Sequence, residues 1–248
     1  MARMTGFSGG LSGKLGSVVF RQNHGETIAS QYQPHVSNPN TQAQADQRAA
    51  FKLITQLAAE VAQSIAIARD GAVSSRNIFT KTNLPLVNVT ETSAGAQAVI
   101  DLQDVQLTNS NIVNDVEFTV ERAQTDLSVS ILNTGGYDRI VFVAMATPHG
   151  TLAVSERPAR LVGQVVYTPT DEPSQTVVIP NVSSLDASTD QTRYTVLAYG
   201  VSFVSGRARE QFDNAVGGNY QAGVNVSRSI NFTDSRLTMT KGYNVPAE

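Results

Sequence analysis

The sequence predicts a mainly β protein: an N-terminal arm with a hairpin, one long helix, and then an antiparallel immunoglobulin-like β-sandwich. Three observations predict this fold class. The first 40 residues are rich in glycine and poor in apolar side chains. The stretch Gln44–Arg69 has apolar residues at helical spacing. From about Leu84 onward the apolar period changes to two, in short runs separated by Gly, Pro, Asn and Asp. We therefore expect an arm over 1–40, a helical segment over 41–83, a sandwich over 84–232 and a C-terminal tail over 233–248.

Within the arm, two short extended runs, Ser17–Arg21 and Glu26–Tyr32, flank Asn23-His24-Gly25, which is a good hairpin turn. An isolated two-stranded hairpin is marginal in water. Fixing the glycines of the preceding segment also costs conformational entropy. The hairpin is therefore expected to pair with another strand system, and the arm to gain its order from a partner.

The helix has clear start signals, because Asn38 or Thr41 can cap it and Pro39 suits its first turn. Apolar residues at spacings of three and four form one narrow stripe along it: Phe51, Ile54, Ala58, Val61, Ile65 and Ala68. This stripe is expected to pack either on the protein's own β domain or on another subunit, and both alternatives stay open. A second short helix is predicted over Ser74–Lys81.

The predicted strands are short apolar or alternating runs: Val99–Leu102, Val116–Glu121, Leu127–Leu132, Arg139–Met145, Leu161–Tyr167, Thr176–Ile179, Tyr194–Val204 and Val224–Phe232. The run Tyr194–Val204 is partly apolar on both faces, which is typical of a central strand. The polar, glycine-bearing stretch Ser205–Tyr220 that follows is expected to be an exposed loop.

Composition narrows the function. With 248 residues and 41% hydrophobic content, the chain can bury a sizeable core. Its net charge of -3 argues against nucleic-acid binding as the main task. Locally, however, Arg3, Lys14 and Arg21 precede the first acid, Glu26, so the arm could face nucleic acid or an acidic surface.

Several classes of protein are not expected. The chain has no cysteine for disulfides or thiolate metal sites. It has no run near the roughly 20 apolar residues that span a bilayer. Because the first residues lack the apolar run of a signal peptide, classical secretion is not expected either.

No constellation of residues predicts an enzyme, and no catalytic, cofactor-binding or metal-binding residue is predicted. The histidines His24, His35 and His149 each lie in a turn-like context that is typical of solvated side chains. The segment Gly9–Lys14 superficially resembles a phosphate-binding loop. It lacks the required glycine spacing and the Ser or Thr after the lysine, so nucleotide binding is not expected.

Two motifs in the first fifth of the chain carry a resemblance. Gly13–Val19 reads G-K-x-G-x-V-V, and Asn38–Phe51 reads N-P-x-T-x-x-Q-x-x-x-R-x-x-F. This arrangement, with a β domain behind it, resembles an uncharacterised family of proteins encoded in bacteriophage and prophage genomes. The resemblance implies a virion structural protein. It carries over the motif positions Asn38, Pro39, Thr41, Gln44, Arg48 and Phe51.

The leading hypothesis is a bacteriophage structural subunit, capsid-associated or coat, that is made in the host bacterial cytoplasm and resides in the virion. Its expected partners are copies of itself and other virion proteins, with no membrane and no small-molecule substrate. Whether the arm also makes a weak nucleic-acid contact stays open. The predicted subunit interface combines arm and helix residues: Val18, Val19, Phe20, Ile28, Asn38, Pro39, Thr41, Gln44, Arg48 and Phe51. The alternatives are a phage tail component, or a carbohydrate- or receptor-binding sandwich that uses Tyr137, Tyr220 or Tyr243.

Overall fold

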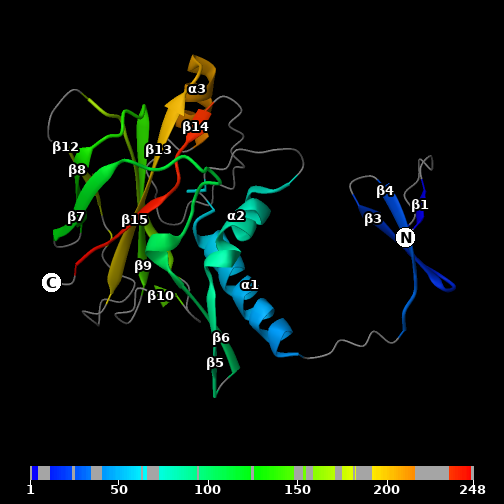
Figure 1. Ribbon diagram of the computed structural model, residues 1–248. Coiled ribbons are helices and arrows are strands. Elements are labelled where there is room, and N and C mark those ends of the chain that lie inside the picture. The colour runs from blue at the N-terminus through cyan, green and yellow to red at the C-terminus, as the bar shows by residue number, and fades with distance from the viewer. Residues whose placement is uncertain are drawn as a thin grey trace. The chain divides into compact units, whose positions relative to one another are not determined.

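A computed structural model divides the chain into two compact units, Met1–Thr41 and Gln42–Glu248, which we call the arm and the body. Both are built from antiparallel sheets, and the chain is mainly β (Figure 1). The structure describes residues 2–4, 12–23, 26–34, 41–62, 64–65, 73–93, 95–123, 126–147, 153–154, 159–170, 175–180, 182, 192–215 and 235–246. The segments predicted as helix, sandwich and tail thus belong to a single unit.

The arm is one four-stranded antiparallel sheet in the order β1-β4-β3-β2. Its strands are β1 Ala2–Met4, β2 Gly13–Leu15, β3 Val18–Asn23 and β4 Glu26–Gln31. The predicted hairpin is confirmed, because β3 and β4 pair with Asn23 opposite Glu26. A second hairpin joins β2 to β3 through Gly16, whose φ of 60° favours glycine. The expected partner strands of the hairpin therefore come from the arm itself.

The long helix is shorter than predicted and docks on the body. It is α1, Gln42–Glu60, and it packs against β5 (Asn88–Thr92), β6 (Gly95–Asp101) and the second helix α2 (Ser75–Asn83). Its stripe is buried at Ala50, Leu53, Ile54, Leu57 and Ala58, and the adjoining Val61 and Ile65 are buried as well. Packing on the protein's own β domain is thus the alternative that the structure shows; Ala68 lies outside the described residues.

Phe51, the first residue of the predicted stripe, is not buried by the body, because it is 54% exposed. Successive helix residues are rotated by about 100°. The buried stripe is centred on Leu53, Ile54 and Leu57, so Phe51 falls to its side. Several overlapping sets of positions on a helix share a spacing of three or four residues. Which set is buried depends on the surface against which the helix docks.

The described residues of the body form three further sheets. One is β10-β6-β5, one is β12-β8-β7, and the largest runs β11-β9-β13, with β14 and β15 both paired to the far side of β13. The remaining strands are β7 Glu117–Ala123, β8 Asp126–Asn133, β9 Arg139–Thr147, β10 Ala153–Val154, β11 Arg160–Tyr167, β12 Gln175–Ile179, β13 Arg193–Phe203, β14 Ser235–Leu237 and β15 Lys241–Asn244. Two short 3-10 helices, η1 Leu84–Leu86 and η2 Leu102–Asp104, and a helix α3, Gly206–Ala215, complete the body.

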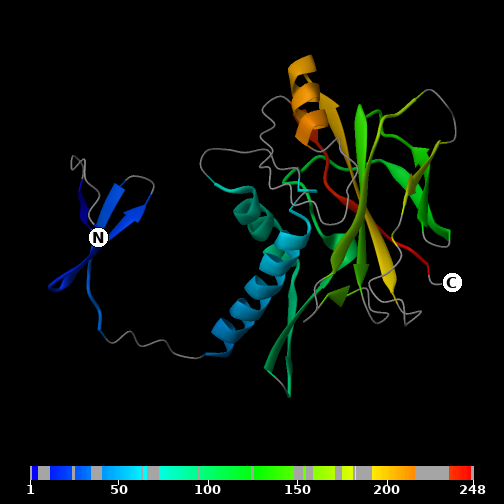
Figure 2. The same ribbon diagram turned by 180° about the vertical axis from the view of Figure 1, so that it is seen from behind.

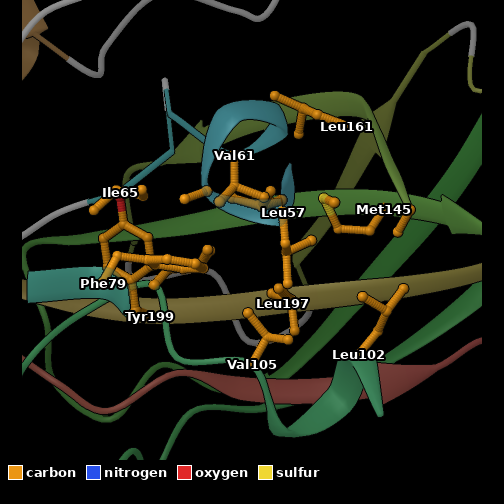
Figure 3. Close-up of a cluster of buried hydrophobic side chains, with 14 of the residues drawn as sticks. Leu57, Val61, Ile65, Phe79, Leu102, Val105, Met145, Leu161, Leu197 and Tyr199 are labelled. Carbon is orange, nitrogen blue, oxygen red and sulfur yellow. The ribbon is translucent and has the colours of Figure 1, made fainter. Parts of the chain in front are cut away.

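The central strands β9 and β13 bury both of their faces, as predicted for Tyr194–Val204. On one side Leu197 and Tyr199 join a core with α1, α2 and β6 (Figure 3). On the other side Val196 and Ala198 join a core with β7, β8 and β12. Figures 1 and 2 show these layers on opposite sides of β9 and β13. The central sheet therefore has a covering layer on each face.

A buried polar network ties the segment that follows α1 to this sheet. The fully buried Tyr199 hydroxyl donates to the backbone oxygen of Ser64 at 3.3 Å, and the Ser64 hydroxyl donates to Oε1 of Gln164 at 2.6 Å. Burial raises the pKa of Tyr199 far above its ordinary value, so the phenol stays protonated and remains a donor.

Two C-terminal predictions are wrong. The stretch expected to be a loop forms α3, because Ala208 and Phe212 find a buried position beside β13. The stretch expected to be a tail supplies β14 and β15, which pair with Val201–Phe203 and Thr195–Ala198. The apolar patterns of these two strands are weak, but β13 offers free backbone groups with which they can pair. The predicted strand Val224–Phe232 lies outside the described residues.

Candidate interaction surfaces of the arm

The arm sheet buries little of its own side-chain surface. Among the described arm side chains only Thr27 is buried, whereas Leu15 is 74% exposed and Tyr32 is 40% exposed. Both hydrophobic cores are formed by residues of the body. A sheet normally buries at least one apolar face against another layer. The two faces of the arm sheet are therefore the first candidates for binding surfaces.

One face, which we call the uncharged face, is defined by the strand register. Directly paired residues share a face and neighbours along a strand alternate. Val18 pairs with Leu15 and Gln31, and Phe20 pairs with Gly13 and Ala29. Gln22 pairs with Thr27 and donates from Nε2 to its hydroxyl at 3.0 Å. The uncharged face thus consists of Gly13, Leu15, Val18, Phe20, Gln22, Thr27, Ala29 and Gln31.

The opposite face, which we call the cationic face, carries Lys14, Val19, Arg21, Ile28, Ser30 and Tyr32. Lys14 pairs with Val19, and Arg21 pairs with Ile28. The backbone register also places Arg3 opposite Ile28. Both Lys14 and Arg21 are exposed. The positive charge of the described arm side chains is therefore confined to one face of the sheet.

Tyr32 lies at the end of β4 and is held there by two contacts. Its backbone N–H donates to the oxygen of Ser17 at 2.6 Å. The Lys14 ammonium lies 3.5 Å from the centroid of its ring. A hollow of about 1030 Å³ is lined here by arm residues that include Lys14, Arg21, Ser30 and Tyr32. None of its described lining residues carries a carboxylate, so the chemistry of the hollow favours an anion.

The structure separates the predicted interface residues. Val18 and Phe20 belong to the uncharged face, whereas Val19 and Ile28 belong to the cationic face, so the four cannot meet one flat partner surface together. In the second group Thr41, Arg48 and Phe51 are exposed and Gln44 is half-buried. Asn38 and Pro39 lie outside the described residues.

Sequence reasoning missed Leu15, Tyr32 and the division into two faces. The signal was present in Gly13–Phe20, where Gly16 and Ser17 separate two runs that can pair as a hairpin. Because this stretch was interpreted as one flexible segment, the alternation of its side chains between the two faces of a sheet was not recognised. With the second hairpin recognised, Leu15, Val18 and Phe20 fall on one side and Lys14 on the other.

The aromatic residues proposed for receptor binding are engaged in packing where the structure describes them. The Tyr137 hydroxyl donates to Asp115 at 2.6 Å, and its ring lies against Gly200. Burial, followed by the hydrogen bond and the charge of Asp115, raises the pKa of Tyr137 to about 12. The Tyr243 ring packs on Phe118 at a centroid distance of 5.8 Å. Tyr220 and the three histidines lie outside the described residues.

In the described parts of the chain, three or more His, Asp or Glu side chains do not gather into a group that could hold a metal ion. Of the helices seen there, none combines the length and the apolar character needed to cross a membrane. Comparison with family models, curated proteins and solved structures found no match to this chain. Functional inference therefore rests on the residues and their geometry.

Proposed function

We propose that this protein is a bacteriophage virion structural subunit, capsid-associated or coat, and that its arm joins it to neighbouring copies and other virion proteins. The observation that carries the proposal is the uncharged face, whose apolar residues join neither hydrophobic core of the described structure. Leu15, Val18 and Phe20 form its apolar centre, and their side chains are exposed or half-buried. The virion resemblance of the sequence motifs supports the same conclusion.

Covering the uncharged face stabilises an assembly appreciably. Burying a Val, Leu or Phe side chain completely is worth about 1.5–3 kcal/mol. The described residues of this face bring no charge into the contact, so two copies can stack without repulsion. Two copies of the cationic face would repel each other. The uncharged face is thus the face that suits contact between identical subunits.

The outward stripe of α1 is a second part of the proposed interface. Gln44, Arg48 and Phe51 lie at spacings of four and three, beside the stripe that docks on the body. Aromatic and arginine side chains are enriched at the centres of protein interfaces. The exposed Phe51 ring is suited to bind a neighbouring chain. The immunoglobulin-like layout of the body remains part of this proposal, as does residence in the virion.

The test is Phe20→Asp in the full-length protein. A charge at the centre of the uncharged face must be desolvated on assembly, so we expect the oligomer to dissociate while the melting temperature of the body stays unchanged. Size-exclusion chromatography with light scattering measures the first quantity and calorimetry the second. The matched control is Leu132→Asp, which puts the same charge on a body residue that is 66% exposed. An oligomer that survives Phe20→Asp, or a wild-type protein that is monomeric at all concentrations, contradicts the proposal.

A further inference from the structure

Formal charge is distributed unevenly between the two units of the chain. Arg3, Lys14 and Arg21 against Glu26 give residues 1–41 a charge of +2, so the rest of the chain carries -5 of the total of -3. The unit with the opposite sign to the whole protein is the one whose described residues belong to neither hydrophobic core. An anionic partner is therefore attracted to the arm and repelled by the body.

Within the arm, the exposed cations and the exposed aromatic ring lie together on the cationic face. Lys14 and Arg21 are on adjacent strands, two register positions apart. Strand geometry puts their backbone positions roughly 8 Å from each other. Tyr32 lies next to Lys14, and the residue is 40% exposed. Lys14, Arg21 and Tyr32 are among the residues that line a hollow of about 1030 Å³, whose lining also includes Gly13, Val18, Ala29 and Gln31 of the uncharged face.

We propose that the cationic face of the arm sheet binds single-stranded nucleic acid without sequence preference. Lys14 and Arg21 contact phosphates, and the Tyr32 ring stacks on a base. On binding, the Lys14 ammonium exchanges the ring for a phosphate, which is the stronger partner for a cation, and the ring becomes free for the base. Sheets that bind single strands elsewhere use the same combination of a positive surface and aromatic platforms.

A nucleic acid fits this face better than an acidic protein surface does. The carboxylates of an acidic protein could pair with Lys14 and Arg21 but would make no use of the Tyr32 ring. A nucleotide presents both a phosphate for the cations and an aromatic base for the ring. The pairing of Lys14 with Tyr32 offers a group for each. Sequence preference is not expected, because stacking and phosphate contacts tolerate every base.

This inference rests on the proposed function in one respect. If the uncharged face is covered by protein, the cationic face is the side of the sheet that remains accessible. The two faces can be tested separately, because their residues alternate along the same strands.

The experiment measures binding of the full-length protein to a fluorescent oligothymidine of about 20 nucleotides, by anisotropy over a series of salt concentrations. We expect Lys14→Gln combined with Arg21→Gln to weaken binding at least tenfold. The slope of log affinity against log salt should become shallower by about 1.4, since each phosphate contact to a single strand contributes about 0.7. Tyr32→Leu should weaken binding about fivefold to tenfold with little change in slope, because stacking releases no counterions.

The matched control is Lys52→Gln combined with Lys81→Gln. These lysines are exposed residues of α1 and α2, so the control changes the net charge by the same amount but leaves the arm intact. Its affinity should stay within twofold of the wild type. An equal loss in the control, or no binding by the wild type at low salt, overturns the inference. So does competition by polyglutamate as strong as that by the oligothymidine, together with an unaffected Tyr32→Leu variant, which would identify an acidic protein as the partner.

Light scattering on the same variants separates this inference from the proposed function. The Lys14→Gln and Arg21→Gln variant should remain assembled, and Phe20→Asp should dissociate. If the wild type binds oligothymidine as a monomer, the assembly proposal fails and the nucleic-acid inference stands. If the wild type assembles through the uncharged face but binds no oligothymidine, the reverse holds.

Discussion

The arm and the body use the same strand chemistry with opposite results. In the body, β13 alternates apolar residues on both faces, and each face is sealed by another layer. In the arm, β3 alternates Val18 and Phe20 with Val19 and Arg21, and none of these side chains is fully buried. The difference lies in the layers and not in the strands. A strand pattern states which face can be buried, and a second layer decides whether it is.

The comparison also separates stability from function. The described residues of the body form two hydrophobic cores and a buried polar network, and these contacts within the body stabilise its fold. The described residues of the arm form a four-stranded sheet but belong to neither hydrophobic core. A sheet whose apolar side chains stay exposed to water gains free energy when a partner buries them. This is why the candidate surfaces fall in the arm.

The largest expected contrast comes from removing the same side chain in the two units. Leu57→Ala deletes a fully buried residue between α1 and the central sheet, and should lower the free energy of unfolding by about 2–5 kcal/mol. Leu15→Ala deletes a leucine that is 74% exposed, and should leave the unfolding of the body within about 0.5 kcal/mol of the wild type. Urea denaturation followed by circular dichroism measures both. Similar losses for the two variants would show that the arm shares the body's cooperative unit.

A smaller effect tests the polar network. Tyr199→Phe removes the donor to the backbone oxygen of Ser64 and leaves a buried acceptor unpaired, so we expect a loss of about 1–2 kcal/mol in unfolding free energy. Tyr167→Phe is the control, since its buried hydroxyl has no hydrogen-bond partner among the described residues and its removal should cost nothing. Thermal unfolding of the two variants measures the difference. If the Tyr199→Phe protein were as stable as the Tyr167→Phe protein, the hydrogen bond from Tyr199 would not contribute to the stability of the body.

The smallest effect is expected at Phe51. Because its ring is 54% exposed, Phe51→Ala should change the free energy of unfolding by no more than about 0.5 kcal/mol. In the assembled protein the same substitution should weaken association, because the ring belongs to the proposed interface. Unfolding is measured on dilute protein and association by light scattering. A loss of about 3 kcal/mol in the dilute protein would instead show that the body buries the Phe51 side chain.

Local patterns predicted the parts of the fold that local chemistry controls. The β3–β4 hairpin follows from a good turn between two extended runs, and its register is set by that turn. The central position of Tyr194–Val204 follows from apolar residues on both faces. Helix α3 and strands β14 and β15 escaped prediction because their own patterns are weak. Their order comes from partners such as β13, and Arg139 adds an ion pair to Asp213 of α3 at 3.3 Å.

The sequence named arm residues as a candidate interface, but it could not assign them to the faces of a sheet. The sequence pointed to the arm, and it named Val18 and Phe20 of the uncharged face. It also grouped them with Val19 and Ile28, which the register puts on the opposite face. Side assignment within a sheet changes with a shift of one residue, so it requires the pairing of strands. In the same way, Phe51 was grouped with a stripe from which the docking of α1 excludes it.

By itself, the sequence determined that a glycine-rich, positively charged N-terminal stretch is followed by a helical segment and then by a β-rich region. Only the tertiary structure decided which face of each element is covered. The physical reason is that a covering layer comes from residues distant in sequence, as when Tyr199 bonds Ser64 across 135 positions. Periodicity within one segment contains no information about that distant partner. The division of the arm sheet into two chemically different faces therefore became visible only when the strands were paired.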